Sequence, residues 1–370
     1  MMATRRATGS TRCVASACVQ SRAMITVNAR CICGPDESFQ PTTITRRDPG
    51  PRDVVIDIAY AGICHSDIDH ARSTRGKSMY PLVPGHEIAG IVSAIGSAVT
   101  RFEVGDRVGV GNMVDACRRC AHCRAGLEQY CSTRVLAYNA IGRDGERTHG
   151  GYSERTVVDE HFVVRIPEAI ALPNAAPLLC AGITMYSPMR HWKVGPGTRV
   201  GIIGFGGLGH VGVQMSRAMG AHTAVFDLSS AKRDDAMRLG ANAYVVTTDP
   251  AALAPLANTL DLIVCTVSVE NLNPYVNLLG LDGTFVNLSI PARPISVSGA
   301  AMLANRRSIA GSRSGGLAET QEMLDFCAAH GIGAEVEVIH ADDIDAAYRR
   351  LLAGDVRFRF VIDNSTLAKA

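Results

Sequence analysis

Four cysteines in one short segment constrain the fold of this chain more than any other feature. Cys117, Cys120, Cys123 and Cys131 follow the spacing C-x2-C-x2-C-x7-C. Four thiolates this close in sequence can complete a tetrahedral shell around one metal ion and leave no coordination position open. A disulfide cluster and an iron–sulfur loop are the alternatives. The bacterial iron–sulfur pattern ends in C-x3-C-P, whereas here the last spacing is seven and Ser132 follows, so we predict a structural zinc site.

A second set of metal-ligand residues precedes this segment and is incomplete. Cys64 lies in AGICHSD, and His86 and Glu87 lie in PGHE. One thiolate, one imidazole and one carboxylate need a further ligand from elsewhere, and an open site is what metal-assisted catalysis requires. A lone cysteine in an apolar stretch is more often a core residue. Because a ligand is missing, however, Cys180 in LLCAG is our candidate for it.

The composition limits what the chain can do. With 370 residues it is long enough for two domains with separate cores. Charged residues make up 19% of the chain and the net charge is +2, which is too balanced for a nucleic-acid-binding surface. No apolar run approaches the ~20 residues that cross a bilayer, so we expect no membrane partner. Five of the twelve cysteines have metal-ligand spacing, so we expect reduced thiols and a cytoplasmic location.

Residues 1–23 are set apart by their composition. They contain four arginines and no acidic residue, which is typical of a transit peptide. A disordered extension or a misplaced start codon is the simpler interpretation, with Met24 as the working start, and we favour it.

From residue 24 onward, short strand signals predict a β-rich domain. Residues 53–59 alternate polar and apolar side chains, and residues 88–95 form another apolar run. The end of the chain returns to this style. Its expected elements are a helix at 319–330, a strand at 335–339, a helix at 344–353 and a strand at 359–363. We therefore assign residues 24–180 and 319–370 to one domain.

A different pattern begins at Thr198. The apolar run 198–203 leads into a G-x-G-x-x-G motif and then a helical run, and this context makes an otherwise weak motif credible. The motif comprises Gly204, Phe205, Gly206, Gly207, Leu208 and Gly209. Its first glycine permits a tight turn, its second lets backbone N–H groups approach a pyrophosphate, and its last lets helix and strand pack closely.

An acidic residue follows where such a domain needs one. Asp227 ends the next strand, 23 residues after Gly204, where a carboxylate would accept hydrogen bonds from the adenosine ribose. A helix N-cap is the alternative role. Further strands at 243–246, 262–265 and 283–288 alternate with helical runs, which predicts a doubly wound parallel sheet. We assign residues 181–318 to this dinucleotide-binding domain.

The motifs together resemble one protein family. They are CHSD, PGHE, GVGNMVDACRRCAHC with LEQYC, GGYSE, APLLCAGITMYSP, GFGGLGH and GDVRFRFVID, in that order. The chain resembles the zinc-dependent medium-chain alcohol dehydrogenases, in the cinnamyl-alcohol-dehydrogenase-like branch that includes bacterial broad-range aldehyde reductases. The resemblance extends over nearly everything from Met24 onward. It implies an α/β fold: a β-rich GroES-like catalytic domain with a structural zinc lobe, and a Rossmann domain with a doubly wound parallel sheet.

The resemblance also implies roles for single residues and two zinc ions per chain. The catalytic zinc ligands would be Cys64, His86 and Cys180, with Glu87 joining or leaving the ion. The structural zinc ligands would be Cys117, Cys120, Cys123 and Cys131. Asp67 would orient the ligand histidine, and Ser66 would be the hydroxyl beside the reacting oxygen. His65 would lie near the cofactor phosphates and Thr184 near the nicotinamide.

The chain departs from the family pattern at the end of the proton path. Relatives commonly carry histidine where this chain has Asp69. Asp69 or the adjacent His70 could replace it, or the alcohol proton could leave through water.

A second departure concerns the cofactor. The branch usually has a small hydroxyl residue at position 227 and uses the phosphorylated cofactor, whereas this chain has Asp227. A carboxylate facing a 2′-phosphate is a like-charge contact that costs roughly a few kcal/mol when poorly screened. Four nearby residues still resemble a phosphate-binding set: Ser229, Ser230, Lys232 and Arg233. We expect NAD(H), with NADP(H) as the alternative.

The implied function is reversible hydride transfer between NAD(P)(H) and a primary alcohol or aldehyde, aromatic or medium aliphatic, in a homodimer. One alternative is a formaldehyde- or thiol-conjugate-processing dehydrogenase of the same fold, which the APLLCAG and VRFRFVID motifs argue against. The other is a non-catalytic dinucleotide-binding relative with only a structural zinc. That alternative predicts a missing catalytic ligand, and all of them are present.

Overall fold

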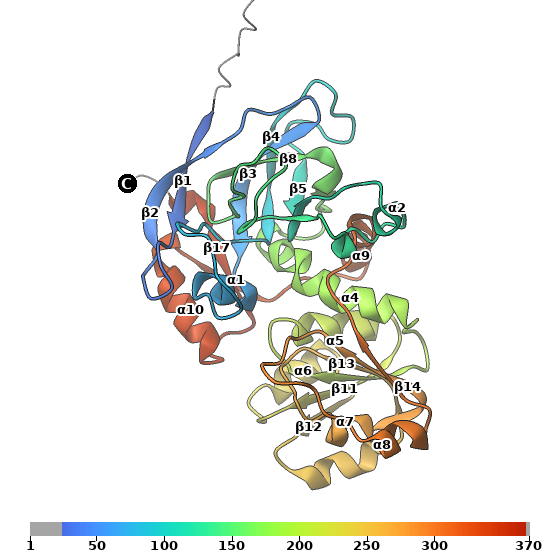
Figure 1. The fold of residues 1–370 in the computed structure, drawn as a ribbon. Helices are drawn as coiled ribbons and strands as arrows, with labels where there is room; N and C mark the ends of the chain where they lie inside the picture. The colour runs from blue at the N-terminus through green and yellow to red at the C-terminus, as the bar shows by residue number, and fades with distance from the viewer. Residues whose placement is uncertain (1–23, 368–370) are drawn as a thin grey trace, which may run out of the picture.

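The chain folds into a β-rich part and an α/β part that meet at two helices. The computed structural model describes residues 24–367, so the prediction for residues 1–23 lies outside it. In Figure 1 the β-rich part lies above the α/β part, and helix α4 (Ala181–His191) connects the two. Helix α9 (Leu317–Ala329) carries the chain back into the β-rich part. Among the described residues, no helix is long and apolar enough to cross a membrane.

A mixed sheet organises the β-rich part. Its strands run in the order β16-β17-β3-β4-β5-β9, with β8 also pairing with β3. These strands are β3 (Asp53–Gly62), β4 (Ile88–Ile95), β5 (Arg107–Val110), β8 (Arg155–Asp159), β9 (Val164–Arg165), β16 (Val336–Ile339) and β17 (Arg359–Asp363). Strand β17 is antiparallel to β3. A late strand of the chain therefore pairs with an early one in the same sheet.

Smaller elements surround this sheet. Two antiparallel pairs are β1 (Ile25–Cys31) with β2 (Gln40–Arg46), and β6 (Met113–Asp115) with β7 (Val135–Leu136). The helices are α1 (His65–Ala71), α2 (Ala121–Arg124), α3 (Leu172–Ala175) and α10 (Ile344–Leu352). Helix α2 belongs to the four-cysteine segment and lies beside α9 in Figure 1.

The α/β part is built on a six-stranded sheet in the order β12-β11-β10-β13-β14-β15. Every neighbouring pair in it is parallel. The strands are β10 (Arg199–Ile203), β11 (His222–Asp227), β12 (Ala243–Val246), β13 (Leu260–Cys265), β14 (Leu279–Asn287) and β15 (Ser308–Gly311). The helices are α5 (Gly209–Ala218), α6 (Arg233–Leu239), α7 (Asn273–Val276) and α8 (Gly299–Ala304). This confirms the predicted doubly wound sheet.

Local sequence explains how the parts pack. The central strand β10 is apolar and buried after its first residue, as expected for a strand covered on both faces. Helix α5 packs against α4 because Gly212 has no side chain, and a Cβ there would overlap Met185. One apolar cluster runs from Val164 in the β-rich part to Val264 in the parallel sheet. The two parts therefore share a core across their junction.

Candidate functional site

The structure gathers the incomplete ligand set into one cluster. Cys64 precedes α1, His86 and Glu87 precede β4, and Cys180 precedes α4. One ligand atom from each of the four lies within 4.8 Å of all the others. The Nε2 atom of His86 lies 3.2 Å from the Sγ of Cys180, which lies 3.9 Å from the Sγ of Cys64. Ligands at bond lengths of ~2.0–2.3 Å around a tetrahedral zinc are separated by roughly 3.5 Å, so the spacing fits zinc.

Asp67 determines how the histidine of this cluster is oriented. Its fully buried carboxylate lies 3.0 Å from the Nδ1 of His86 and accepts hydrogen bonds from the backbone N–H groups of Cys64 and Gly85. An ionised carboxylate only accepts, so Nδ1 carries the proton. Nε2 is the ring nitrogen that faces the thiols, which is the arrangement that a metal-ligating histidine needs.

The surroundings of the cluster favour a deprotonated thiol at Cys64. A hydrogen bond from Cys180 lowers the pKa of Cys64 well below its ordinary value against the opposing effect of burial, and His86 and Arg359 add to the lowering. The same hydrogen bond and burial raise the pKa of Cys180. These opposite directions favour the thiolate form at Cys64, and thiolates are what zinc binds.

Glu87 joins this cluster to the glycine-rich segment. It is fully buried and forms an ion pair with the buried Arg359 of β17. Its Oε2 atom has no hydrogen-bond partner among the described residues, and burial raises the pKa of this carboxyl to about 7. An oxygen without a partner fits a carboxylate that can enter a metal's ligand shell. The other side of Arg359 lies against the glycine-rich loop, where a Cβ on Gly207 would be 2.7 Å from its Cδ.

The four-cysteine segment forms the second cluster, with all four sulfur atoms within 4.8 Å of one another. Backbone N–H groups of Cys117, Cys120 and Cys123 donate to sulfur atoms of the set at 3.3–3.5 Å. The bond from the Cys117 N–H lowers the pKa of Cys131 to about 6. All ten cysteines in the described part of the chain are free of disulfides. The geometry fits a closed tetrahedral metal site.

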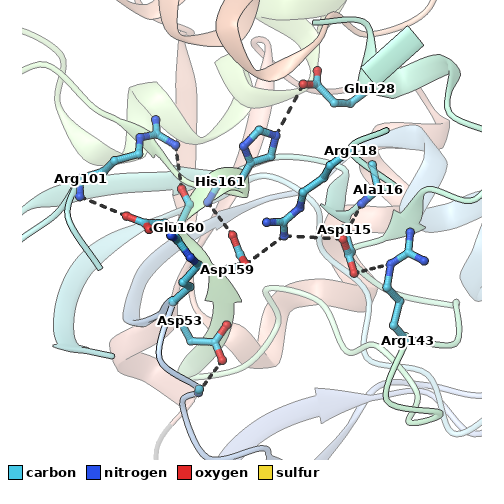
Figure 2. A network of polar contacts seen from close by, with 12 residues as sticks. Asp53, Arg101, Asp115, Ala116, Arg118, Glu128, Arg143, Asp159, Glu160 and His161 are labelled. Atoms are coloured by element: carbon cyan, nitrogen blue, oxygen red, sulfur yellow. Dashed lines mark hydrogen bonds and ion pairs between the residues drawn. The ribbon is translucent and has the colours of Figure 1, made fainter. Parts of the chain in front are cut away.

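A polar network fastens this segment to its surroundings (Figure 2). Arg118 pairs with Asp159 at 2.9 Å and lies 3.7 Å from Asp115. Buried Glu128 faces the Nε2 of His161 at 3.6 Å with one oxygen, and accepts the Leu317 N–H at 3.2 Å with the other. That N–H starts α9, so Glu128 caps the helix.

This cap has a consequence for the first cluster, because α9 packs against α4. The Tyr186 hydroxyl of α4 donates to Glu322 of α9 at 2.9 Å, and a Cβ on Gly182 would lie 3.1 Å from the Sδ of Met323. Cys180 is the residue from which α4 starts. The four-cysteine segment is thus connected to the position of Cys180 through two packed helices.

The other residues predicted for catalysis are only partly brought together. The Oγ of Ser66 lies 3.6 Å from the Sγ of Cys64 and is exposed. The carboxylate of Asp69 instead pairs with Arg75 at 2.9 Å and accepts the Thr74 hydroxyl at 2.8 Å.

His70 lies on the other side of the same helix end. Its Nδ1 accepts a hydrogen bond from the side-chain amide of Asn139 at 2.9 Å, and its ring meets Tyr138 edge-on at 5.3 Å. Tyr138 in turn donates to the backbone oxygen of Ser66 at 3.4 Å. His70 is therefore connected to Ser66 through Tyr138, whereas Asp69 is engaged elsewhere.

The glycine-rich loop has the shape expected of a dinucleotide-binding turn. Gly204 has a φ of 92°, which favours glycine. A Cβ on Gly209 would overlap the Gly204 oxygen, whereas a Cβ on Gly206 would meet nothing within 4 Å. Gly206 therefore faces open space, as an anion-binding turn requires. Exposed His65 is the first residue of α1, and half-buried Thr184 lies one turn into α4.

Asp227 lies at the end of β11, beside this loop. Its two carboxylate oxygens accept the N–H groups of Phe205 at 2.9 Å and Leu228 at 2.6 Å. The side chain is thus held at the loop by the backbone. Two of the predicted phosphate-binding cations pack on rings: the Nζ of Lys232 lies 5.5 Å above Phe358, and Arg233 stands over Tyr244. Ser229 accepts the Ala231 N–H at 3.4 Å.

Sequence reasoning missed three residues that connect these sites. Glu128, His210 and Arg359 lie inside the motifs LEQYC, GFGGLGH and GDVRFRFVID. A charged side chain or an imidazole ring inside a family motif was the only signal in the sequence that these residues connect the sites. Their partners lie far along the chain, for example 189 residues away for Glu128 and 272 for Arg359.

Comparison with known proteins agrees with this arrangement. Residues 50–168 match the alcohol dehydrogenase GroES-like domain family, and residues 207–329 match the zinc-binding dehydrogenase family. NADP-dependent alcohol dehydrogenase C of Mycobacterium bovis is 56% identical over 346 residues, 93% of this chain and all of that protein. Aldehyde reductase YahK of Escherichia coli is 49% identical over 336 residues, 90% of this chain and 96% of that protein.

A solved structure extends the likeness to the whole described fold. Cinnamyl alcohol dehydrogenase SbCAD4 of Sorghum bicolor superposes with a TM-score of 0.91 at 40% identity, covering 94% of this chain and 100% of that one. Relatives this similar over nearly their full length share the fold and the order of its domains with this chain. Its two ligand clusters and its glycine-rich turn thus lie within a fold that these relatives share. The chain belongs to the zinc-dependent medium-chain alcohol dehydrogenases, in the branch of the cinnamyl alcohol dehydrogenases.

Proposed function

We propose that the chain is an alcohol dehydrogenase and aldehyde reductase that interconverts a primary alcohol and its aldehyde with a nicotinamide dinucleotide. One observation carries the proposal: the buried ion pair of Glu87 and Arg359 joins the incomplete ligand cluster directly to the glycine-rich loop. A metal site and a dinucleotide turn that share one buried contact suit a reaction between substrate and cofactor. A protein with only a structural metal has no need of this connection.

The residues have separate tasks in this reaction. Cys64, His86 and Cys180 would hold a catalytic zinc, with Glu87 as the exchangeable fourth ligand, and the four-cysteine set would hold a structural zinc. When bound, zinc acts as a Lewis acid on the substrate oxygen and the nicotinamide exchanges the hydride. Asp67 keeps the His86 tautomer fixed. The Ser66 hydroxyl, 3.6 Å from the Cys64 sulfur, is positioned to pass the alcohol proton outward.

Metal analysis tests this assignment separately from activity. Purified protein should contain two zinc ions per chain. Cys64→Ser should lose one of them and all turnover of benzaldehyde with NADH or NADPH, while the fold is kept. Cys123→Ser should instead lower the unfolding temperature, because it opens a closed shell. Cys33→Ser is the matched control, since that thiol is exposed and outside both clusters. Full activity in Cys64→Ser would refute the assignment.

The cofactor is proposed to be NAD(H), in contrast to the relative named NADP-dependent. Support comes from Asp227. Two backbone N–H groups hold its carboxylate beside the loop, where it would contact the ribose of the cofactor. A fixed carboxylate accepts hydrogen bonds from ribose hydroxyls and repels a 2′-phosphate. The named relative supports the opposite choice, and the comparison of the two cofactors is therefore the deciding measurement.

A homodimer is proposed from the exposed edge of the parallel sheet. Strand β15 ends that sheet, and exposed apolar side chains lie near it: Leu281, Ile290 and Leu303 are 68%, 69% and 84% exposed. An unpaired edge strand with exposed apolar neighbours favours pairing with a second copy. The free thiols support a cytoplasmic location for this assembly.

A further inference from the structure

His210 lies where the two parts of the protein meet and has no role so far. It is the second residue of α5, directly after the glycine-rich loop, and it is fully buried. Its Nδ1 lies 3.2 Å from the Gly206 oxygen within that loop, and its Nε2 lies 3.1 Å from the backbone nitrogen of Glu335. Glu335 immediately precedes β16 of the β-rich part. One ring therefore joins the loop to the opposite part.

The two partners determine the protonation state of the ring. A backbone N–H only donates, so Nε2 must accept from Glu335. A carbonyl oxygen only accepts, so Nδ1 carries the proton and donates to Gly206. Burial lowers the pKa of His210 to about 3, so the ring is neutral at physiological pH. Both ring nitrogens are satisfied in this one tautomer and in no other.

The ring is also held from its face. Phe358 stacks on it at 4.7 Å and 9°, and Phe205 meets Phe358 edge-on at 5.2 Å. The two neighbours of Phe358 complete the junction: Arg357 forms an ion pair with Asp235 of α6, and Arg359 pairs with Glu87. Three consecutive side chains thus contact α6, His210 and the candidate metal site.

The Gly206 carbonyl accepts the backbone N–H of His210 at 3.1 Å as well as its ring Nδ1–H at 3.2 Å, and together these two bonds fix the direction of the next N–H group. The C=O of Gly206 and the N–H of Gly207 belong to one planar trans peptide unit and point in opposite directions. Because the carbonyl points at His210, the Gly207 N–H points away from it. That N–H has no acceptor within residues 24–367, and the loop faces open space at Gly206. This is the orientation in which a backbone N–H can bind a phosphate.

We propose that His210, as a neutral Nδ1–H tautomer, is a positioning residue that holds the glycine-rich loop in its cofactor-binding shape and fastens it to the β-rich part. This inference rests on the proposed function, in which the loop binds a nicotinamide dinucleotide. The proposal adds the residue that keeps the loop preorganised and its contact with the backbone of Glu335 in the β-rich part.

Two conservative substitutions separate the two hydrogen bonds. Asparagine in His210→Asn places an N–H donor near the position of Nδ1 and removes the acceptor for Glu335. Glutamine in His210→Gln places an oxygen acceptor near the position of Nε2 and removes the donor to Gly206. His222→Gln is the matched control, because that histidine is exposed and lies in β11 of the same sheet. NADH binding to the zinc-loaded protein is measured by quenching of protein fluorescence.

We expect His210→Gln to raise the dissociation constant of NADH about tenfold, the size of one lost hydrogen bond. His210→Asn should stay within about threefold of the parent in cofactor binding, and the control should bind as the parent does. At saturating NADH, kcat of His210→Gln should stay within about twofold of the parent, because the residue acts through the loop. Parent-like NADH binding in both variants would overturn the proposal.

A second measurement is made on the parent protein and needs no activity. Nitrogen-15 NMR of histidine-labelled parent protein, with the His210 signals identified by their loss in His210→Gln, reports the tautomer directly. A protonated Nδ1 and an unprotonated Nε2 at neutral pH support the proposal. A protonated Nε2 or a charged ring refutes it. If the parent bound neither NADH nor NADPH, the proposed function would fail, and the tautomer would still decide whether His210 joins the two parts.

Discussion

Replacing Asp227 by serine should move cofactor preference from NADH towards NADPH. The carboxylate is held at the end of β11 by the N–H groups of Phe205 and Leu228, so it cannot easily turn away from a ribose bound at the loop. Two unit charges about 5 Å apart repel by about 3 kcal/mol at an effective dielectric constant of about 20. Salt and partial exposure reduce this to about 1.5–2.5 kcal/mol, or about 10- to 70-fold in kcat/KM for NADPH.

Serine should also weaken NADH binding, because one hydroxyl replaces two carboxylate oxygens at the ribose. The loss should be about 5- to 10-fold in kcat/KM for NADH. Initial rates of benzaldehyde reduction, with each cofactor varied in turn, give both numbers. The control is Asp261→Ser. Its carboxylate also accepts a backbone N–H, from Arg199 at 2.8 Å, but it lies near the start of β13, at the end of the parallel strands opposite to that of Asp227.

The outcome that refutes this reasoning is a preference that does not move. If Asp227→Ser changes the ratio of the two kcat/KM values by less than about threefold, the carboxylate does not face the 2′ position. A parent protein that already prefers NADPH, combined with an unchanged ratio in the variant, would show that the nearby cations decide the preference. Lys232 and Arg233, which stack on Phe358 and Tyr244, would then be the residues to replace.

Three further predictions concern stability and assembly. Glu128→Ala should lower the unfolding temperature by about 3 °C or more, because a lost helix cap costs about 1 kcal/mol. Calorimetry should show no such loss in the control Glu168→Ala, and the zinc content of both variants should stay at two per chain. The unfolding free energy should fall between pH 6.5 and 4, because His210 is neutral when folded (pKa about 3) and takes up a proton when unfolded; urea titrations should show about 2 kcal/mol lost at pH 5. If the unfolding free energy of the parent and of His210→Asn depended on pH in the same way, protonation of His210 would be excluded as the cause. Ile290→Glu should shift the mass measured by light scattering from dimer to monomer, and an unchanged mass would move the proposed interface elsewhere.

Local pattern was enough to predict most of the fold and the spacing of the four-cysteine segment. The four-cysteine spacing, the strand before Gly204 and the alternation in β3 are short-range signals, and each prediction of this kind depended on residues within about a dozen positions. The parallel sheet and the α/β class are confirmed. Cys180 was proposed as the missing ligand because the open set was incomplete and because of the resemblance, and the structure places its sulfur 3.2 Å from the Nε2 of His86.

Contacts between distant segments could not be predicted in this way. Nothing near Glu87 in the sequence points to Arg359, and nothing near Glu128 points to the start of α9. The same limit affected the proton path. Asp69 and His70 were both candidates on position alone, and the structure shows that Asp69 pairs with Arg75, whereas His70 packs on Tyr138. Such choices depend on which side chains meet after folding, and a one-dimensional pattern does not contain that information.

The open ligand cluster depends on the four-cysteine cluster through this long-range packing. The four-cysteine segment supplies all its ligands locally and can form early, because its loops are short. The other cluster needs Cys180, which precedes α4, and α4 is placed by α9, whose first turn Glu128 caps. The closed site therefore provides the fixed point against which the open site is assembled. In the proposed assignment, the closed zinc site thus supports the position of one ligand of the open site, which is a physical reason for two zinc ions in one chain.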